Sequence, residues 1–185
     1  MIIGITGTDG GGKGTVADYL VHDKKFVHYS SRALITGELE KQGLPIDRNQ
    51  MRLVANELRA RFGDDVIVLN ALEAIKEAGV ENAVVESIRT LAEAVTLKKN
   101  HGILLAVDAD PNIRYARVQG RRSASDHVSY EQFLAHEELE KNDPDPHGMQ
   151  KEAVMALADY TIMNNKGFSE LKSAIETFLN THGST

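Results

Sequence analysis

The chain begins Met1-Ile2-Ile3-Gly4-Ile5-Thr6-Gly7-Thr8-Asp9-Gly10-Gly11-Gly12-Lys13-Gly14-Thr15, an apolar run followed directly by a glycine-rich segment. This order predicts a strand over residues 1–5, a loop over residues 7–15, and then a helix with Val16, Tyr19 and Leu20 on its apolar face. Glycines let successive backbone N–H groups converge on phosphate oxygens, because no side chain intervenes. The start of the helix adds free N–H donors and a partial positive charge. The sequence therefore predicts a loop that binds the phosphates of a nucleoside triphosphate.

The polar residues of this loop suit phosphate chemistry. Lys13 supplies a mobile cation for the β- and γ-phosphates, and the hydroxyl of Thr15 is placed to ligate Mg²⁺. An ordinary glycine-rich turn is the competing interpretation, and the coincidence of the motif with its strand–helix context argues against it. We expect the following residues to bind ATP, with Mg²⁺ at Thr15: Asp9, Gly10, Gly11, Gly12, Lys13, Gly14 and Thr15.

Length and composition limit the class of protein. The 185 residues are 42% hydrophobic and 26% charged, which fits one soluble globular domain over residues 1–185. The absence of cysteine excludes disulfides and thiolate metal sites. A formal net charge of −6 argues against broad nucleic-acid binding, and no apolar run approaches the roughly 18 residues that span a bilayer. We therefore expect a cytoplasmic protein, monomeric or a small homo-oligomer, without nucleic-acid or membrane partners.

Strand and helix patterns alternate along the chain, which predicts an α/β domain with a largely parallel sheet. Further strands are expected over residues 26–29, 83–85, 103–107 and 160–163. Because ligands gather at the carboxyl ends of parallel strands, the polar residues that follow them are candidates for the site. They are Ser30 and Arg32 after the second strand, Glu86 and Arg89 after the third, Asp108 and Asp110 after the fourth, and Asn165 after the last.

Each of these strand-end residues has a functional and a structural interpretation. Glu86 is suited to hold the hydration shell of Mg²⁺, or to pair with Arg89. Arg89 is suited to clamp a phosphate, or to form a structural ion pair. Asp108 and Asp110 are interpreted as caps of the helix that follows.

Two sets of arginines recur on helices. Arg48, Arg52 and Arg59 fall within about 40° of each other on a helix that starts after Asp47, so they form either a basic edge toward an anionic acceptor or a solvated face. A second set lies on the helix that begins at residue 111 and leads into a polar segment at 120–148. Its members recur at i, i+3 and i+7, and a lid that closes with them would stabilise a transferred phosphoryl group and exclude water. They are Arg114, Arg117 and Arg121, of which we expect the last two to act in catalysis and Arg114 to fit either role equally.

These motifs together resemble the nucleoside monophosphate kinase superfamily, close to archaeal-type kinases related to adenylate kinase and dephospho-coenzyme A kinase. The resemblance covers nearly the whole chain and depends on residues 7–15, 86–89, 117–121 and 158–165. It implies a three-layer sandwich with a five-stranded parallel sheet, an acceptor-binding helical region at about 30–63 and a lid at about 120–148. It also implies that the loop containing Asn165 packs on the adenine. The substrate-binding residues would then be Ser30, Arg32, Arg52, Arg59 and Arg89.

Departures from the family pattern leave the acceptor open. Glu86-Ser87 stands where these kinases usually have Asp-Gly, and Thr36 occupies the expected arginine position. No aspartate within residues 26–33 offers a base for a hydroxyl acceptor, and a phosphate acceptor needs none. The sequence therefore favours ATP- and Mg²⁺-dependent transfer of the γ-phosphoryl group to a nucleoside or deoxynucleoside monophosphate. The expected catalytic residues are Lys13, Arg89, Arg117 and Arg121. The alternatives are dephospho-coenzyme A kinase-like phosphorylation of a hydroxyl group, and a non-kinase ATP-binding switch or ATPase.

Overall fold

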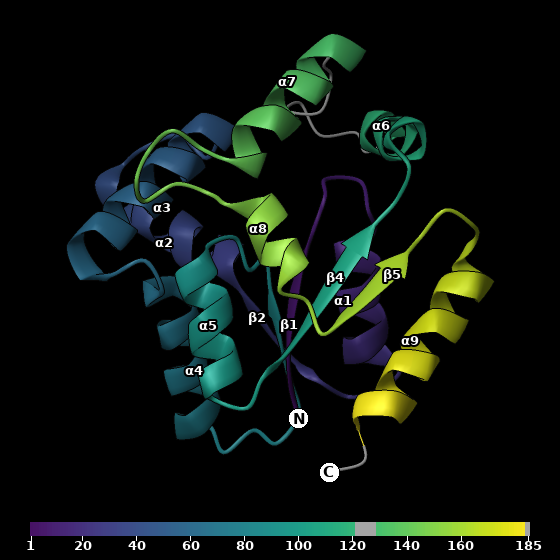
Figure 1. Cartoon of the computed structure of the whole chain (residues 1–185). Helices are drawn as coiled ribbons and strands as arrows, with labels where there is room; N and C mark the ends of the chain where they lie inside the picture. Colours follow the sequence, from purple (N-terminus) through teal and green to yellow (C-terminus); the bar gives the residue numbers. More distant parts are fainter. Residues whose placement is uncertain (121–128, 184–185) are drawn as a thin grey trace.

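The computed structural model describes residues 1–120 and 129–183, without the side chain of Arg48. Within these residues the strands form one parallel sheet in the order β2-β3-β1-β4-β5 (Figure 1). The strands are β1 (Ile2–Gly7), β2 (Val27–Ser30), β3 (Ala83–Glu86), β4 (Ile103–Asp108) and β5 (Tyr160–Met163). The predicted five-stranded parallel sheet is confirmed, and β2 begins and ends one residue later than the sequence pattern predicted.

Helices cover both faces of the sheet, as the resemblance implied. They are α1 (Lys13–His22), α2 (Ser31–Gln42), α3 (Arg48–Phe62), α4 (Val66–Glu77), α5 (Leu91–Lys99), α6 (Pro111–Gly120), α7 (Tyr130–Lys141), α8 (Lys151–Ala156) and α9 (Phe168–His182). On one face α1 and α9 bury Val16, Leu20 and Phe178 against the strands. On the other face α4, α5 and α8 bury Leu97 and Val154. The fold is therefore the predicted three-layer α/β sandwich.

The strand order brings the segments after β1, β3 and β4 together at one edge. Parallel pairing places Ile5 of β1 beside both Glu86 of β3 and Leu105 of β4. Their carboxyl ends therefore meet where the chain connections leave in opposite directions, which is where open α/β sheets bind ligands. Figure 1 shows α7 beyond this edge, with α2 and α3 to one side of it.

The regions expected to bind the acceptor and to form the lid are largely helical. The region at 30–63 contains α2 and α3, which pack on α4 through a small core that includes Ile35, Leu39 and Val54. The predicted lid at 120–148 contains α7, and its residues 121–128 lie outside the described part of the chain. A single functional domain over residues 1–185 stays a prediction.

Local capping explains where several helices start. The side chain of Asp47 accepts a hydrogen bond from Gln50 N (2.9 Å), and Ser129 forms the predicted capping box with Gln132. The prediction that Asp108 caps α6 is wrong. Its carboxylate accepts hydrogen bonds from Thr8 Oγ1 (2.5 Å) and from the N–H of the following residue, so it ties β4 to the first loop.

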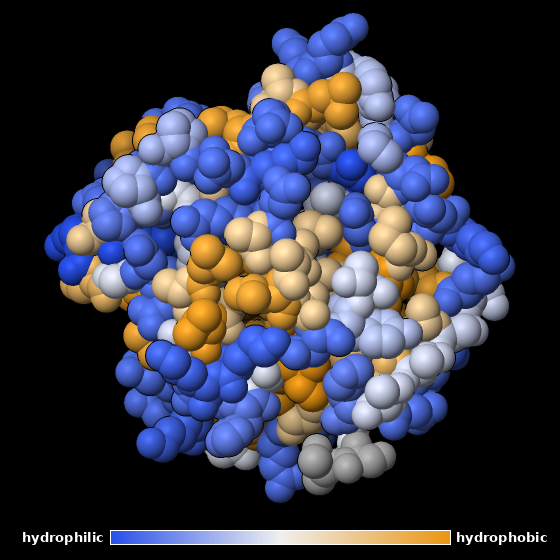
Figure 2. All heavy atoms as spheres, viewed as in Figure 1, coloured by the Kyte–Doolittle hydropathy of each residue, from blue (hydrophilic) through white to orange (hydrophobic). Residues whose placement is uncertain are grey.

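Most of the surface in Figure 2 is hydrophilic, and apolar residues gather mainly over α5 and α8. Across residues 1–120 and 129–183, the helices are too short or too polar to cross a bilayer.

Candidate active site

The glycine-rich loop has a backbone that only glycine adopts without strain. Gly7, Gly10 and Gly12 have φ values of 133°, 77° and 112°, all in the range that L side chains rarely occupy. A Cβ on Gly7 would lie 2.0 Å from the carbonyl oxygen of Val107, and one on Gly12 would lie 2.3 Å from Nδ2 of Asn164. The glycines therefore allow both the turn and its close approach to β4 and β5.

The start of α1 is open toward a ligand. Its N-cap is Gly12, which offers no side-chain cap, and the first turn carries no acidic residue. The first helical hydrogen bond is from Val16 N to Gly12 O (3.0 Å), so the N–H groups of residues 13–15 have no intrahelical acceptor. Thr15 is exposed beside them. This arrangement suits an anion next to a hydroxyl group.

Lys13 is folded back over the loop. Its Nζ donates hydrogen bonds to the carbonyl oxygens of Gly7 (2.9 Å) and Thr8 (2.7 Å) and lies 3.8 Å from Oδ1 of Asp9. Burial, with a smaller contribution from the nearby cations Lys151 and Arg89, lowers the pKa of Lys13 from 10.5 to about 8, while Asp9 opposes them. An anion over the loop would therefore relieve an unfavourable environment for this ammonium group.

Glu86 ends β3 within the electrostatic reach of Lys13. Its Oε2 lies 3.1 Å from Nε2 of His28 on β2. This hydrogen bond lowers the pKa of Glu86 and raises the pKa of His28. The carboxylate is thus held ionised, as a role in holding hydrated Mg²⁺ requires. Its partner is His28, whereas the structural alternative considered for Glu86 was a pair with Arg89; β2 and β3 are paired, which brings His28 within reach.

Ser87 stands at a position where the monophosphate kinases that this chain resembles usually have glycine. It has φ of 74°, a left-handed conformation that favours glycine, and its N–H donates to the carbonyl oxygen of Ile5 (2.9 Å). The glycine usual at this position in monophosphate kinases matches that geometry. Here the turn is made by serine, at a cost in backbone strain.

Arg89 acts electrostatically on both Glu86 and Lys13. Its guanidinium contacts Sδ of Met149 (3.3 Å), and it has no carboxylate partner within the described ranges. Its backbone N–H donates to Oε2 of Glu93 (2.7 Å), which fixes the start of α5. The side chain is therefore held by packing while its positive charge stays open to a ligand.

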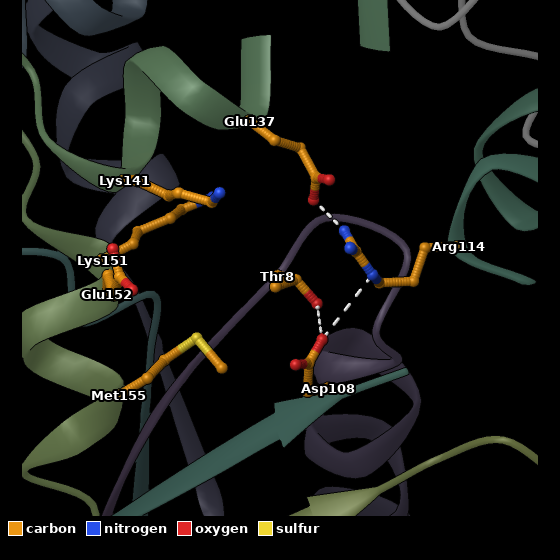
Figure 3. Close-up of a pocket in the computed structure, with 8 residues that line it drawn as sticks. All are labelled: Thr8, Asp108, Arg114, Glu137, Lys141, Lys151, Glu152 and Met155. Carbon is orange, nitrogen blue, oxygen red and sulfur yellow. Dashed lines mark hydrogen bonds and ion pairs between the residues drawn. The ribbon is translucent and has the colours of Figure 1, made fainter. Parts of the chain in front are cut away.

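The arginines of α6 have different partners. Arg117 donates to the carbonyl oxygens of Gly10 (3.3 Å) and Asn164 (2.9 Å), so it joins the phosphate loop to the loop after β5. Arg114 is buried and is hydrogen-bonded to Glu137 of α7, which indicates its structural role (Figure 3). Arg121 lies outside the described residues, and its catalytic role stays a prediction.

On the acceptor side, two predicted arginines are paired with carboxylates. Arg59 and Glu93 each keep 1% of the side chain exposed and are 3.0 Å apart. Arg52 is 3.1 Å from Asp143, in the segment that follows α7. Arg59 is therefore buried in the core instead of lying on a basic edge, because Glu93 reaches it from α5. Arg32 is exposed at the start of α2, next to the half-buried Ser30 that ends β2.

A cavity of about 380 Å³ lies between the end of β5 and α9. It is lined in part by Asn164, Asn165 and Lys166. Asn165 accepts a hydrogen bond from Asp110 N (2.8 Å), and Nδ2 of Asn164 donates to Gly11 O (2.8 Å). Asn165 thus lines a cavity together with Asn164, which is hydrogen-bonded to the phosphate loop, and its role in nucleotide binding stays a prediction.

A second cavity, of about 230 Å³, lies on the other side of the phosphate loop, between β4, α6, α7 and α8 (Figure 3). Lys151 contributes to its wall, and the side chain is hydrogen-bonded to Glu140 of α7 and lies 3.3 Å from Oδ1 of Asp9. No sequence motif singled out Lys151, since it follows an irregular polar segment. Its place in the site depends on folding alone.

The donor set fits ATP with Mg²⁺. Open backbone N–H groups, Lys13 and Arg89 suit polyphosphate oxygens, while Thr15 and the ionised Glu86 are oxygen donors of the kind Mg²⁺ uses. Within residues 1–120 and 129–183, no cluster of three or more histidine or acidic side chains could hold a metal by itself. Mg²⁺ usually keeps water and phosphate ligands, so one or two protein donors suffice.

Fold and loop together define this protein as a P-loop protein with the kinase-type α/β fold. The shikimate kinase of Bacteroides thetaiotaomicron superposes with a TM-score of 0.60 at 15% identity, over 98% of this chain and 97% of that one. TT1252 of Thermus thermophilus superposes with a TM-score of 0.58 at 25% identity, over 98% and 97% of the two chains.

Sequence comparison then gives the family. The family model described as AAA domain matches residues 3–143. The UPF0200 protein of Pyrococcus abyssi is 30% identical over 97% of this chain and 95% of its own length. That of Methanococcus maripaludis strain S2 is 27% identical over 95% and 93%. The chain belongs to this AAA domain family and to the UPF0200 proteins.

Proposed function

We propose that this protein transfers the γ-phosphoryl group of ATP to a nucleoside or deoxynucleoside monophosphate, with Mg²⁺. The observation that carries the proposal is the open phosphate loop: three left-handed glycines, an uncapped helix start and the partly desolvated Lys13. A loop of this kind at the switch point of a parallel sheet is suited to polyphosphate.

In the proposed reaction, an oxygen of the acceptor phosphate attacks the γ-phosphorus, and the bond to the bridging oxygen of ADP breaks. Lys13 and the loop amides hold the donor, while Arg89 and Arg117 offset the charge on the moving group, with Arg121 as a further candidate. Thr15 and Glu86 would hold hydrated Mg²⁺, which would supply positive charge to offset that of the phosphates. A phosphate acceptor is already ionised, so no side chain has to remove a proton.

Adenine would occupy the cavity beside Asn165, on the far side of the loop from α3. The acceptor would lie between Ser30, Arg32 and Arg89. We expect Arg52 to take part only if it leaves Asp143, and Arg59 to support α3 rather than contact the acceptor.

The second candidate is a hydroxyl acceptor, as in dephospho-coenzyme A kinase-like reactions. The pairing of Arg52 and Arg59 with carboxylates favours it, because it leaves fewer cations for an acceptor phosphate. The carboxylate of Asp9, 3.8 Å from Lys13 Nζ, would then be a candidate base beside the donor site.

An ADP-release assay with ATP and Mg²⁺ over a panel of nucleoside and deoxynucleoside monophosphates and dephospho-coenzyme A tests the proposal. We expect turnover with at least one monophosphate, and loss of that turnover in Lys13→Ala. Lys24→Met is the matched control, because Lys24 pairs with Glu176 far from the loop. Turnover on dephospho-coenzyme A alone would establish the second candidate. ATP binding without acceptor-dependent turnover would indicate a switch or ATPase.

A further inference from the structure

Lys151 is a buried lysine whose charge is matched by two different parts of the fold. Its side chain is 8% exposed, and its Nζ is 3.3 Å from Asp9 in the phosphate loop and hydrogen-bonded to Glu140 in α7. A buried ammonium group requires such partners, because loss of hydration is costly. Lys151 therefore connects the phosphate loop to the helix that follows α6.

The amine of Lys151 is also close to the expected phosphate position. Lys13 Nζ lies 3.8 Å from Oδ1 of Asp9, and this is the same oxygen that lies 3.3 Å from Lys151 Nζ. The positive charges of Lys151 and Arg89 both act on Lys13. Cations from α1, α8 and the segment after β3 thus converge over one loop.

We propose that Lys151 is a further phosphate-binding residue, and that Glu140 occupies its amine until a polyphosphate enters. The inference rests on the proposed function. Carboxylate and phosphoryl oxygens are both anionic acceptors of charge-assisted hydrogen bonds, so a terminal phosphate can replace Glu140 at Nζ. The exchange changes no covalent bond.

The incoming phosphate would displace Glu140 rather than Asp9 from Lys151, because Glu140 belongs to a separate helix. Asp9 is fixed in the loop between the two amines, whereas Glu140 comes from the end of α7. The cavity of about 230 Å³ beside Lys151 provides room for an incoming phosphoryl group, and Figure 3 shows Lys151 at its wall. Glu137, one turn earlier on α7, holds Arg114 and keeps the helix in place. Occupation of the phosphate site would therefore exchange the α7 contact of Lys151 for a phosphoryl contact, while α7 stays attached through Glu137.

Titration calorimetry of the full chain with inorganic tripolyphosphate and, separately, with ATP tests the inference. Lys151→Met should weaken tripolyphosphate binding about 10- to 100-fold, the effect of losing one charge-assisted hydrogen bond. Lys151→Arg should stay within about threefold of the wild type, since it keeps the cation. Glu140→Gln should bind more tightly than the wild type, because the competing carboxylate is gone. Lys24→Met should bind like the wild type.

The outcomes separate the inference from the proposed function. If Lys13→Ala loses binding while Lys151→Met keeps wild-type affinity, the phosphate loop acts as proposed and the role of Lys151 is refuted. If Glu140→Gln binds no more tightly than the wild type, competition by Glu140 is refuted. If wild-type protein binds neither probe, both proposals fail. Thermal unfolding identifies any variant that does not fold. If Lys151→Met does not fold, the affinities of the two single variants Lys151→Arg and Glu140→Gln decide whether Lys151 binds phosphate in competition with Glu140.

Discussion

Replacing Lys13 with methionine should stabilise the protein while removing its affinity for nucleotide. Methionine has a similar length and no charge, so the substitution removes a cation whose side chain is only 13% exposed. Burial lowers the pKa of Lys13 from its ordinary value of 10.5 to about 8. At about 1.4 kcal/mol per pH unit, this difference corresponds to about 3 kcal/mol of destabilisation at neutral pH.

The expected net gain is smaller than this figure. The variant also loses the hydrogen bonds from Nζ to the carbonyl oxygens of Gly7 and Thr8, each worth about 1 kcal/mol. We therefore expect the free energy of unfolding at pH 7 to rise by about 1 to 2 kcal/mol, which is a few degrees in Tm for a chain of this size.

The pH dependence has a definite sign. Between about pH 8 and pH 10.5 the unfolded chain still holds the proton on Lys13, whereas the folded chain has released it. Wild-type stability therefore rises with pH relative to the variant. The difference in free energy of unfolding between the wild type and Lys13→Met should be constant below pH 8. By pH 10.5 it should change by about 3 kcal/mol in favour of the wild type.

Urea unfolding of the wild type and Lys13→Met at several values between pH 6.5 and 10.5, without nucleotide, measures this gap. Lys24→Met controls for the loss of a lysine from a lysine–carboxylate pair away from the loop. Addition of ATP and Mg²⁺ should stabilise the wild type by mass action and leave Lys13→Met unchanged. A variant that is less stable than the wild type at pH 7, with a gap that does not vary with pH, would refute the reasoning.

Two further substitutions test the supports of the site. Glu93→Gln should lower the free energy of unfolding by about 3 kcal/mol, because it leaves the charge of Arg59 buried without a counter-charge; urea unfolding with a loss below about 1 kcal/mol would contradict this. His28→Asn should remove a contribution that is present below about pH 6.5 and is lost as pH rises through the raised pKa of His28, since Glu86 holds the protonated ring. Its stability deficit, measured by thermal unfolding, should therefore be larger at pH 5.5 than at pH 8.5, and equal deficits would rule out the pairing.

The chemistry of the phosphate loop could be predicted because its residues are consecutive. Strand, glycines, lysine and helix follow one another within residues 1–20, and glycine geometry depends on local backbone sterics alone. The same holds for the capping box at Ser129 and for the alternation that predicted the parallel sheet.

Residue-by-residue roles were harder to predict where the partner is distant in sequence. Helical periodicity placed Arg59 beside Arg52 on one edge, but periodicity does not say which neighbour packs against that edge. In the fold, Glu93 of α5 faces Arg59 and the pair is buried. For the same reason the partner of Glu86 is His28 on the adjacent strand.

The sequence by itself determined the fold class, the phosphate loop and the identity of Lys13 and Thr15 as candidate donors, because these depend on contiguous residues and on the period of the apolar pattern. Only the tertiary structure decided which charges meet over that loop. Lys151 and Asp9 are far apart in the chain, and their contact depends on where α8 packs against the sheet. Charge pairing acts through space at a few ångströms, so it follows the packed fold rather than the order of residues.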